Sequence, residues 1–214
     1  FCLSRGLGDV YKRQREVRSL EVIRNLHHHF LIRTSSYYSE EECLVIVMEL
    51  ADGSLRDRLK ECLKEGLPGI PAAELAGYFS ESAEAVDYLH DKEVLHRDIK
   101  PDNILLVEGH VRLADFGLAR HQDRFMVSVS GSGTPAYMAP EVWRGKASTQ
   151  SDQYSLAYTY AELRLGRRPF SSTDFAAVMY DHIDHIPDLE ALREGEQRVL
   201  LRALAKDPGQ RYPT

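Results

Sequence analysis

The residues best suited to chemistry lie in one short segment near the middle of the chain. Asp98 could accept a proton, and Lys100 and Asn103 follow it closely. A second acidic residue, Asp115, comes a short distance further on. An amide oxygen and a carboxylate are ligands that Mg²⁺ accepts, and a lysine beside a carboxylate can offset charge on a reacting group. This set of residues fits the metal-assisted transfer of a phosphoryl group to a hydroxyl.

The residues between Asn103 and Asp115 predict how these two side chains come together. Two short apolar runs typical of strands flank a turn that contains Gly109, which can take positive φ without cost. We expect a three-residue turn in which Val107 faces Val111, and this register places Asn103 opposite Asp115. Opposed residues lie about 5 Å apart, so both side chains could reach a metal ion at about 2 Å. The hairpin is therefore a predicted frame for a Mg²⁺ site.

Three blocks carry a family resemblance: residues 96–103 read His-Arg-Asp-Ile-Lys-Pro-Asp-Asn, 115–117 Asp-Phe-Gly and 139–141 Ala-Pro-Glu. In this order they resemble the signature of eukaryotic-like (Hanks-type) serine/threonine protein kinases, over roughly Glu16 to the last residue. The resemblance implies an α+β, two-lobed fold with an incomplete small lobe and a mostly helical large lobe. It also implies transfer of the γ-phosphate of ATP, with Mg²⁺, to Ser/Thr hydroxyls of proteins. The chain has the look of a bacterial member.

The resemblance also implies roles for single residues. Asp98 would accept the proton of the incoming hydroxyl, and Lys100 would offset charge on the transferring group. Asn103 and Asp115 would hold Mg²⁺. Thr134 matches the hydroxyl that contacts the catalytic Asp and Lys in serine/threonine enzymes, which implies Ser/Thr as the acceptor.

The apolar run 44–48 resembles the last strand of the small lobe, which leads into the hinge between the lobes. Met48 would then lie at the back of the ATP site. The Glu49 carbonyl and the Ala51 amide and carbonyl would bind adenine, with Leu105 packed beneath the ring.

Other residues have structural roles by the same resemblance. Glu141 would pair with Arg211 and clamp the segment before it to the large lobe, because a buried bidentate pair is costly to break. Asp152 would begin the central helix of the large lobe and hold the backbone of the catalytic loop. Phe116 and Gly117 complete the Asp-Phe-Gly block.

The beginning of the chain does not fit this family. Residues 4–14 resemble, residue for residue, an in-frame translation of a transposase-based sequencing-library adapter, so we expect residues 1–14 to be non-native. The alternative is that residues 6–10 are the remnant of a glycine-rich phosphate loop, with Lys12 as its lysine. Against this alternative, no strand precedes Gly6 and a third glycine is missing.

On this interpretation residues 15–49 are a partial small lobe and residues 50–214 a large lobe that ends early. The glycine-rich loop and the small-lobe lysine would be missing, so the fragment itself could be inactive even if the parent enzyme is a kinase. Glu16 is the candidate for the helix glutamate that pairs with that lysine.

Length and composition bound the remaining possibilities. The 214 residues carry a formal net charge of −6, which argues against nucleic acid as a partner. Cys43 and Cys62 have no metal or disulfide spacing, which favours a reducing cytoplasm. No apolar stretch approaches the length of a membrane span, although a membrane tether outside the fragment is possible.

Helix signals surround the chemical segment. Ser54 is a plausible cap for a helix to about Lys64, and residues 72–92 carry apolar residues at helical spacing. A buried helix from Asp152 to Leu165 would stop at Gly166. The histidine clusters 27–29 and 181–185 lack a convergent ligand set, so we interpret them as a turn and a solvated helix face.

Regulation and two other functions remain open at this stage. A phosphate on Ser128, Ser130 or Ser132 could bind Arg97 and order the segment that carries these serines. Alternatively, the serines could serve only to keep this loop soluble. A pseudokinase scaffold would normally show damage at the catalytic positions, which are intact. A small-molecule phosphotransferase would not be expected to carry the Gly-Thr-Pro-Ala-Tyr-Met-Ala-Pro-Glu run.

Overall fold

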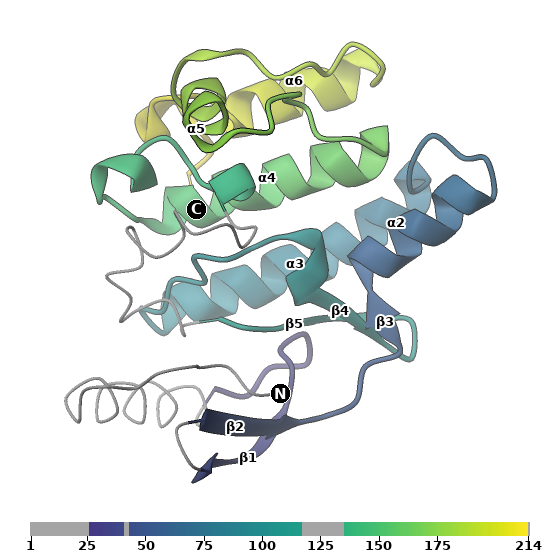
Figure 1. Cartoon of the computed structure of the whole chain (residues 1–214), viewed down its shortest axis with the longest axis vertical. Helices are drawn as coiled ribbons and strands as arrows, with labels where there is room; N and C mark the ends of the chain where they lie inside the picture. The colour runs from purple at the N-terminus through teal and green to yellow at the C-terminus, as the bar shows by residue number, and fades with distance from the viewer. Residues whose placement is uncertain (1–25, 41–42, 117–134, 214) are drawn as a thin grey trace.

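The computed structural model describes residues 26–40, 43–116 and 135–213. At one end of the molecule, β1 (Thr34–Glu40) and β2 (Cys43–Met48) form an antiparallel pair (Figure 1). A second sheet has the strand order β3-β4-β5. Its strands are β3 (Gly53–Ser54), β4 (Ile104–Val107) and β5 (His110–Leu113).

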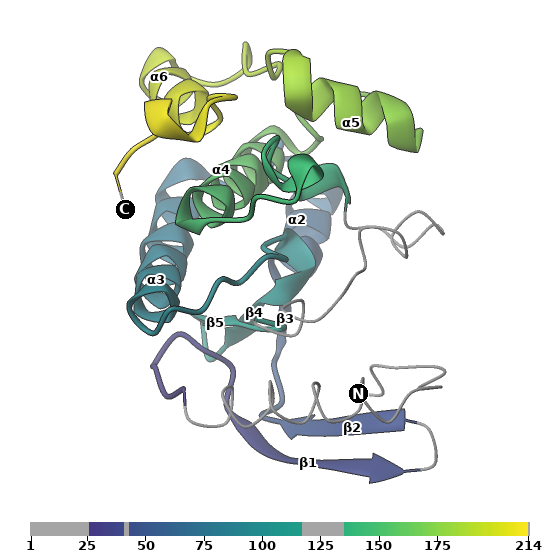
Figure 2. The ribbon, with the colours of Figure 1, turned by 90° about the vertical axis from the view of Figure 1, so that its left-hand side faces the viewer.

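Helices occupy the other end of the molecule, beyond the second sheet (Figure 2). They are α2 (Leu55–Lys64), α3 (Ala72–Asp91), α4 (Thr149–Leu165), α5 (Phe175–Asp184) and α6 (Glu194–Ala203). Short 3₁₀ turns are η1 (Pro101–Asn103), η4 (Pro135–Tyr137), η5 (Val142–Arg144) and η6 (Pro208–Gln210). The α+β class and the partial two-lobed arrangement predicted from the sequence are confirmed.

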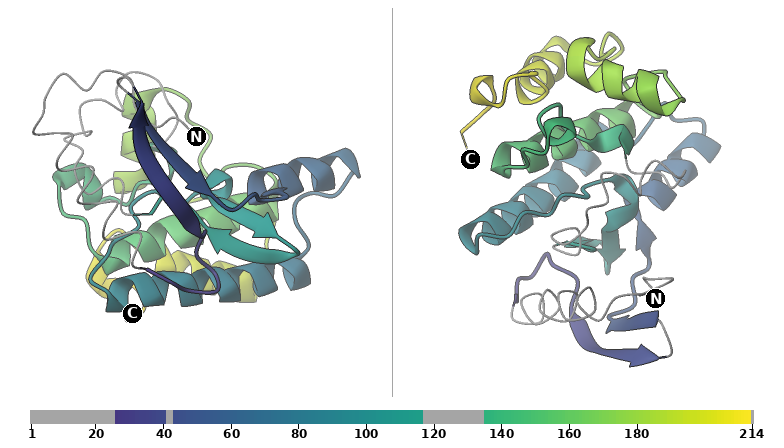
Figure 3. Two further views of the ribbon diagram at one scale, coloured as in Figure 1. Left: turned by 90° about the horizontal axis from the view of Figure 1, so that it is seen from below. Right: turned by 60° about the vertical axis from the view of Figure 1, so that its left-hand side comes forward.

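The two ends of the molecule are joined by backbone hydrogen bonds to β5. The Ile32 amide donates to the Leu113 carbonyl at 3.0 Å, and the Leu113 amide donates to the Phe30 carbonyl at 2.8 Å. Leu31 and Ile32 are buried in the same apolar cluster as Leu113. The chain before β1 therefore packs directly on the strand that leads to Asp115. The right view of Figure 3 shows the β1–β2 pair at one end of the molecule and the helices at the other.

The helix signals read from the sequence are confirmed at α2 and α3. Ser54 caps α2 in a reciprocal capping box with Asp57, which satisfies two amides of the first turn. α3 ends at Asp91, one residue before the predicted end. Among the helices of the described ranges, none has the length and apolar character of a membrane span.

α4 is buried on most of its faces because it lies between two apolar clusters. Leu163 belongs to the cluster that includes α2, α3 and the second sheet. Tyr154, Tyr158 and Ala161 belong to a cluster shared with α6 and η4. The predicted buried helix is confirmed, and Gly166 ends it with a φ of 69°. The predicted start at Asp152 is wrong, because Ser148 and Ser151 form a capping box that begins the helix at Thr149.

The predicted register of the β4–β5 hairpin is wrong. Val107 pairs with His110 and not with Val111, so the turn has two residues, Glu108 and Gly109, both at positive φ. Such turns match the right-handed twist of a hairpin. A glutamate rarely takes positive φ, but here its amide donates to Asp52 Oδ2 at 2.8 Å, which offsets the strain.

The interpretation of residues 181–185 as a solvated helix face is also wrong for two of its members. Asp181 and His182 are buried, whereas His185 is exposed. This side of α5 packs on η4 and α4. The charged residues next to it in the sequence do not reveal this tertiary contact.

We predict opposite effects on stability from two Gly→Ala changes. A methyl group on Gly166 would overlap the main-chain oxygen of Pro68 at a backbone conformation that alanine disfavours. Gly166→Ala should therefore lower the free energy of unfolding by about 2 kcal/mol or more. Gly77 lies inside α3 with open space around it, so Gly77→Ala should raise stability by about 0.5–1 kcal/mol. Urea denaturation of the full-length protein measures both, and equal effects would contradict this account.

Candidate active site

The Asp98 carboxylate has one oxygen held by the protein and one without a partner. Oδ2 accepts hydrogen bonds from Lys100 Nζ at 2.8 Å and from Asn103 Nδ2 at 2.9 Å. Oδ1 is buried and has no hydrogen-bond partner among the described residues. A buried, unpartnered oxygen is costly unless something else binds it. The carboxylate is therefore held in place with one acceptor position open.

The loop that carries Asp98 is fixed by Asp152 in the first turn of α4. Asp152 Oδ2 accepts from the His96 amide at 2.9 Å, and Oδ1 accepts from the Arg97 amide at 2.8 Å. His90 Nε2 lies 2.8 Å from the same Oδ2. Arg97 has a φ of 68°, a strained value for a non-glycine residue, and the bond to its amide helps to maintain it.

His96 supports the same loop from inside and was not assigned a role by sequence reasoning. Its ring is fully buried, and Nδ1 accepts from the Asp98 amide at 3.3 Å. The ring packs edge-on against Phe116, with 6.3 Å between ring centroids. Burial lowers the pKa of His96, so the ring stays neutral and can act as that acceptor.

Asn103 and Asp115 both lie near Asp98, but not through the predicted pairing. In the observed register the Ala114 amide donates to the Asn103 carbonyl at 2.9 Å, so Ala114 takes the place predicted for Asp115. Asp115 has a φ of 60°, which changes the direction of the chain at this point. Burial, and then the negative charge of Asp98, raise the pKa of Asp115. The electrostatic effect of one carboxylate on the other places both in one acidic site.

The predicted hinge residues lie where β2 ends. The Glu49 amide donates to the Arg33 carbonyl at 3.0 Å, and Glu49 Oε1 accepts from the Arg33 amide at 2.9 Å. Within the described ranges, the Glu49 carbonyl and the Ala51 amide and carbonyl have no hydrogen-bond partner. Met48 and Leu105 are half-buried and pack on the same apolar cluster. These groups are accessible for the proposed contacts with a nucleotide.

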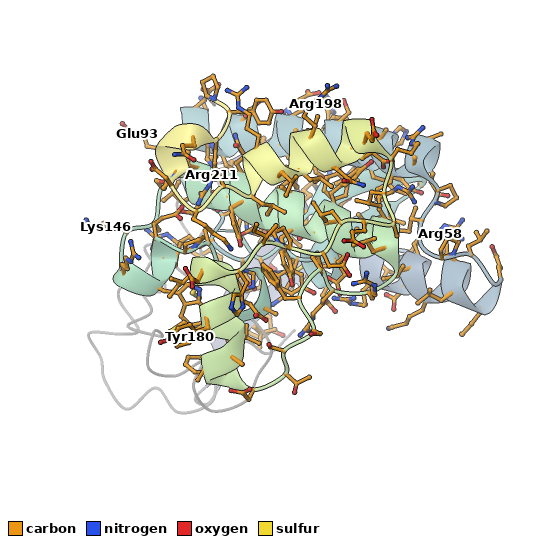
Figure 4. The ribbon with its side chains drawn as sticks, turned by 90° about the horizontal axis from the view of Figure 1, so that it is seen from above. Arg58, Glu93, Lys146, Tyr180, Arg198 and Arg211 are labelled. Atoms are coloured by element: carbon orange, nitrogen blue, oxygen red, sulfur yellow. The ribbon has the colours of Figure 1, made fainter. Side chains whose placement is uncertain are left out.

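The predicted pair of Glu141 and Arg211 forms, and it is buried and bidentate. Arg211 Nη1 and Nη2 donate to the two carboxylate oxygens of Glu141, each at 2.8 Å. Ser151 Oγ donates to Glu141 Oε1 at 2.6 Å, and Arg211 also binds the carbonyls of Gln150 and Ala205. Arg211 lies among the helices, away from the rim of the molecule (Figure 4). Burial alone would raise the pKa of Glu141, but these bonds outweigh it and lower the pKa.

Sequence reasoning missed a second, partly buried charge network beside the catalytic loop. Arg56 in α2 donates to Glu162 Oε1 at 2.9 Å and to the Tyr137 hydroxyl at 2.6 Å. Tyr137 donates in turn to Glu162 Oε2 at 2.7 Å, and Arg56 reaches Asp102 Oδ2 at 3.3 Å. A glutamate inside an otherwise buried helix signals a buried partner, so Glu162 was a detectable clue. The network connects α2, α4, η4 and the catalytic loop.

Several predicted residues lie outside the described ranges: Glu16, Gly117, Ser128, Ser130, Ser132 and Thr134. Arg97 is described and exposed, and within the described ranges no residue forms a hydrogen bond or ion pair with its side chain. No group of three or more His, Cys, Asp or Glu side chains in the described ranges could hold a metal.

The fold and this arrangement define a protein kinase domain. The family model described as "Protein kinase domain" matches residues 8–213, so the chain belongs to the protein kinase family. Relatives of the chain are named as serine/threonine-protein kinases, the branch that the sequence predicted. The match begins within residues 1–14, whose non-native origin stays a prediction, as do the boundaries of the two lobes.

The curated relatives include kinases from distant organisms. The chain is 32% identical over 211 residues to the serine/threonine-protein kinase RUNKEL of Arabidopsis thaliana, and over 227 residues to the serine/threonine-protein kinase PknF of Mycobacterium tuberculosis. These alignments cover 95% and 96% of this chain, but 15% and 45% of the relatives. Ribosomal protein S6 kinase alpha-2 of Homo sapiens is 32% identical over 208 residues, with 95% of this chain and 28% of the relative covered. The chain thus spans less than half the length of these relatives.

We predict a large and pH-dependent loss of stability when the buried pair is broken. Arg211→Met leaves Glu141 buried without its cation and should lower the free energy of unfolding by about 3–5 kcal/mol at pH 7. The folded pKa of Glu141 lies below its ordinary value of 4.5, so its stabilising contribution is present above pH 4.5 and is lost as pH falls through the folded pKa. The difference in the free energy of unfolding between wild type and Arg211→Met should therefore shrink as the pH falls below 4.5.

Arg167→Met is the matched control for this prediction. Arg167 pairs with Asp188 at 2.6 Å, but both side chains are half exposed, so water can replace the bond. Urea denaturation between pH 7 and pH 4 should show little effect of this change. Equal destabilisation by the two arginine variants would contradict the account of the buried pair.

Proposed function

We propose that the protein to which this chain belongs is an ATP-dependent serine/threonine kinase that phosphorylates proteins. The open Oδ1 of Asp98, beside an Oδ2 held by Lys100 and Asn103, is the observation that carries the proposal. Such an oxygen can accept a hydrogen bond from an incoming hydroxyl, orient it and take its proton as transfer proceeds. The relatives support the class of reaction, because they are serine/threonine-protein kinases by name.

Lys100 and the Arg97 backbone support this role. The Lys100 ammonium pairs with the Asp98 carboxylate and adds positive charge where the transferring phosphoryl group would lie. The strained backbone at Arg97 sets the direction in which the next residue, Asp98, enters the site.

The available oxygen ligands fit Mg²⁺ and ATP. Asn103 Nδ2 donates to both the carbonyl and the carboxylate of Asp98, which leaves Oδ1 of Asn103 on the opposite side of its amide. Asp115 offers a second hard oxygen, and burial, followed by the negative charge of Asp98, raises its pKa. Mg²⁺, when bound with ATP, would neutralise charge on the phosphates, and a site with few protein ligands suits it. We assign Asn103 and Asp115 as its protein ligands.

The hinge groups complete the nucleotide site in this proposal. The Glu49 carbonyl and the Ala51 amide and carbonyl bind the adenine edge, Leu105 packs beneath the ring, and Met48 limits the depth of the site. Use of ATP also fits the cytoplasmic location that the cysteine content favours.

Serine or threonine in a protein is the proposed acceptor. Thr134 supports this choice, because it matches the hydroxyl that contacts the catalytic Asp and Lys in serine/threonine enzymes. Tyr137, three residues later, is bonded to the network of Arg56, which reaches Asp102 in the catalytic loop. This chain of contacts supports an acceptor site on the side of the catalytic loop that faces η4.

We predict that Asp98→Asn abolishes most kinase activity. The amide cannot accept a proton, so the rate of phosphate transfer to a protein substrate should fall about 100-fold or more. Asp91→Asn, the same change at an exposed position at the end of α3, is the control and should retain activity. Transfer of radiolabelled phosphate from ATP by the full-length protein measures both. Equal rates for Asp98→Asn and wild type would refute the assigned role.

We predict that phosphorylation of the segment that contains Ser128, Ser130 and Ser132 raises kinase activity. Replacing Ser128, Ser130 and Ser132 together by alanine should lower activity about tenfold, the equivalent of losing one charge-assisted hydrogen bond to Arg97. Arg97→Gln should lower activity similarly, and the two changes together should not add, because both remove one interaction. Steady-state rates of the full-length variants test this, and full activity of the serine variant would rule the switch out.

A further inference from the structure

His182 lies at a buried junction of three elements that no assigned role explains. Its ring is 1% exposed. Nδ1 lies 2.9 Å from the hydroxyl of Tyr154 in α4, and Nε2 lies 3.0 Å from the main-chain oxygen of Ala136 in η4. The side chain therefore connects α5 and α4 to the 3₁₀ turn that follows Thr134.

The direction of each hydrogen bond follows from the chemistry of its partners. A carbonyl oxygen can only accept, so Nε2 carries the hydrogen that it donates to Ala136. In a neutral ring Nδ1 is then an acceptor, and the Tyr154 hydroxyl donates to it. Burial, and then the charge of Lys206, lower the pKa of His182 to about 4, so the ring is neutral at physiological pH. The Ala136 carbonyl thus fixes the tautomer, and the Tyr154 hydroxyl stabilises it by donating to Nδ1.

The surroundings hold the ring in one orientation. The Tyr158 and Phe170 rings pack against it, with centroid separations of 4.9 and 5.1 Å. Lys206 Nζ donates to the carbonyls of Asp181 and His182 at 3.0 and 2.8 Å, which secures the end of α5. These contacts pack the ring on two sides and anchor its helix, so they restrain the position of Nε2.

The turn that His182 binds is anchored at two further points. The Tyr137 carbonyl accepts from Ser155 Oγ at 2.8 Å, and the Tyr137 hydroxyl belongs to the network of Arg56 and Glu162. These contacts attach η4 to α4 and, through Arg56, to the catalytic loop. The bond from His182 is the anchor on the α5 side of the turn.

We propose that His182, oriented by Tyr154, is a positioning residue for the acceptor substrate. By holding the Ala136 carbonyl, His182 sets the path of η4, and η4 lies beside the catalytic loop on the side where we place the acceptor. The hinge and the β4–β5 hairpin make no contact with His182 among the residues that the structure describes. This inference rests on the proposed kinase function, and it predicts an effect on peptide binding without an effect on ATP.

His182→Phe and His182→Gln in the full-length kinase separate positioning from packing. Phenylalanine suits the aromatic surroundings but cannot donate to Ala136, so KM for a serine peptide selected with the wild-type enzyme should rise about tenfold. Glutamine places an N–H near the position of Nε2, so KM for the peptide should stay within about 1.5-fold of wild type. KM for ATP should stay within about twofold for both variants.

Stability should rank the two variants in the opposite order to their binding of the peptide, because a buried amide packs poorly among aromatic rings. The melting temperature of His182→Phe should equal or exceed that of His182→Gln. A purely structural histidine would instead give the higher peptide KM in the variant with the lower melting temperature, which is His182→Gln. His185→Gln, on the exposed side of α5, is the control and should leave KM for both substrates unchanged.

Tyr154→Phe gives an independent test if His182→Phe does not fold. Without the hydroxyl, Nδ1 loses its donor and the tautomer that binds Ala136 is less favoured, so KM for the peptide should rise about threefold. If the kinase is active and KM for the peptide is unchanged in His182→Phe or in Tyr154→Phe, the positioning role alone is overturned. A wild-type protein that phosphorylates no protein or peptide would overturn the proposed function and this inference together.

Discussion

One buried carboxylate holds the catalytic loop in its working conformation. Asp152 accepts hydrogen bonds from two successive amides, those of His96 and Arg97, and Arg97 has a positive φ. A non-glycine residue keeps such a conformation only where its surroundings enforce it. Because Asp98 follows directly, the direction of its side chain depends on these two bonds. The reactive group of the site is therefore set by a helix that comes about fifty residues later in the chain.

α4 supplies this carboxylate and most of the other anchors. It lies between two apolar clusters, so it cannot move without opening one of them. Ser155 and Glu162 hold the turn at Tyr137, and Tyr154 orients His182, which holds the same turn from the other side. The same helix thus supports the catalytic loop and the turn beside it. Because α4 supports both, the catalytic loop and the turn at Tyr137 should keep a constant position relative to each other.

Two errors of the sequence-based predictions have a common cause. The hairpin register shifted by one residue because the Asp52 carboxylate, far away in the chain, accepts the amide of Glu108 and stabilises an unusual backbone conformation. His182 was placed on a solvated face because its neighbours in sequence are charged, yet its ring is enclosed by Tyr158 and Phe170. In both cases a contact distant in sequence outweighed the local pattern.

The sequence by itself determined the chemical groups, the family and the local starts and stops of helices, as at Ser54 and Gly166. Phosphoryl transfer needs particular atoms at short spacing, and helix caps act within one turn, so both leave local signals. Only the tertiary structure decided that Asp98 would have one open oxygen and that a half-buried Arg56 would pair with the buried Glu162. Those features depend on which polar groups meet when apolar surfaces close, and chain segments far apart in sequence supply the partners.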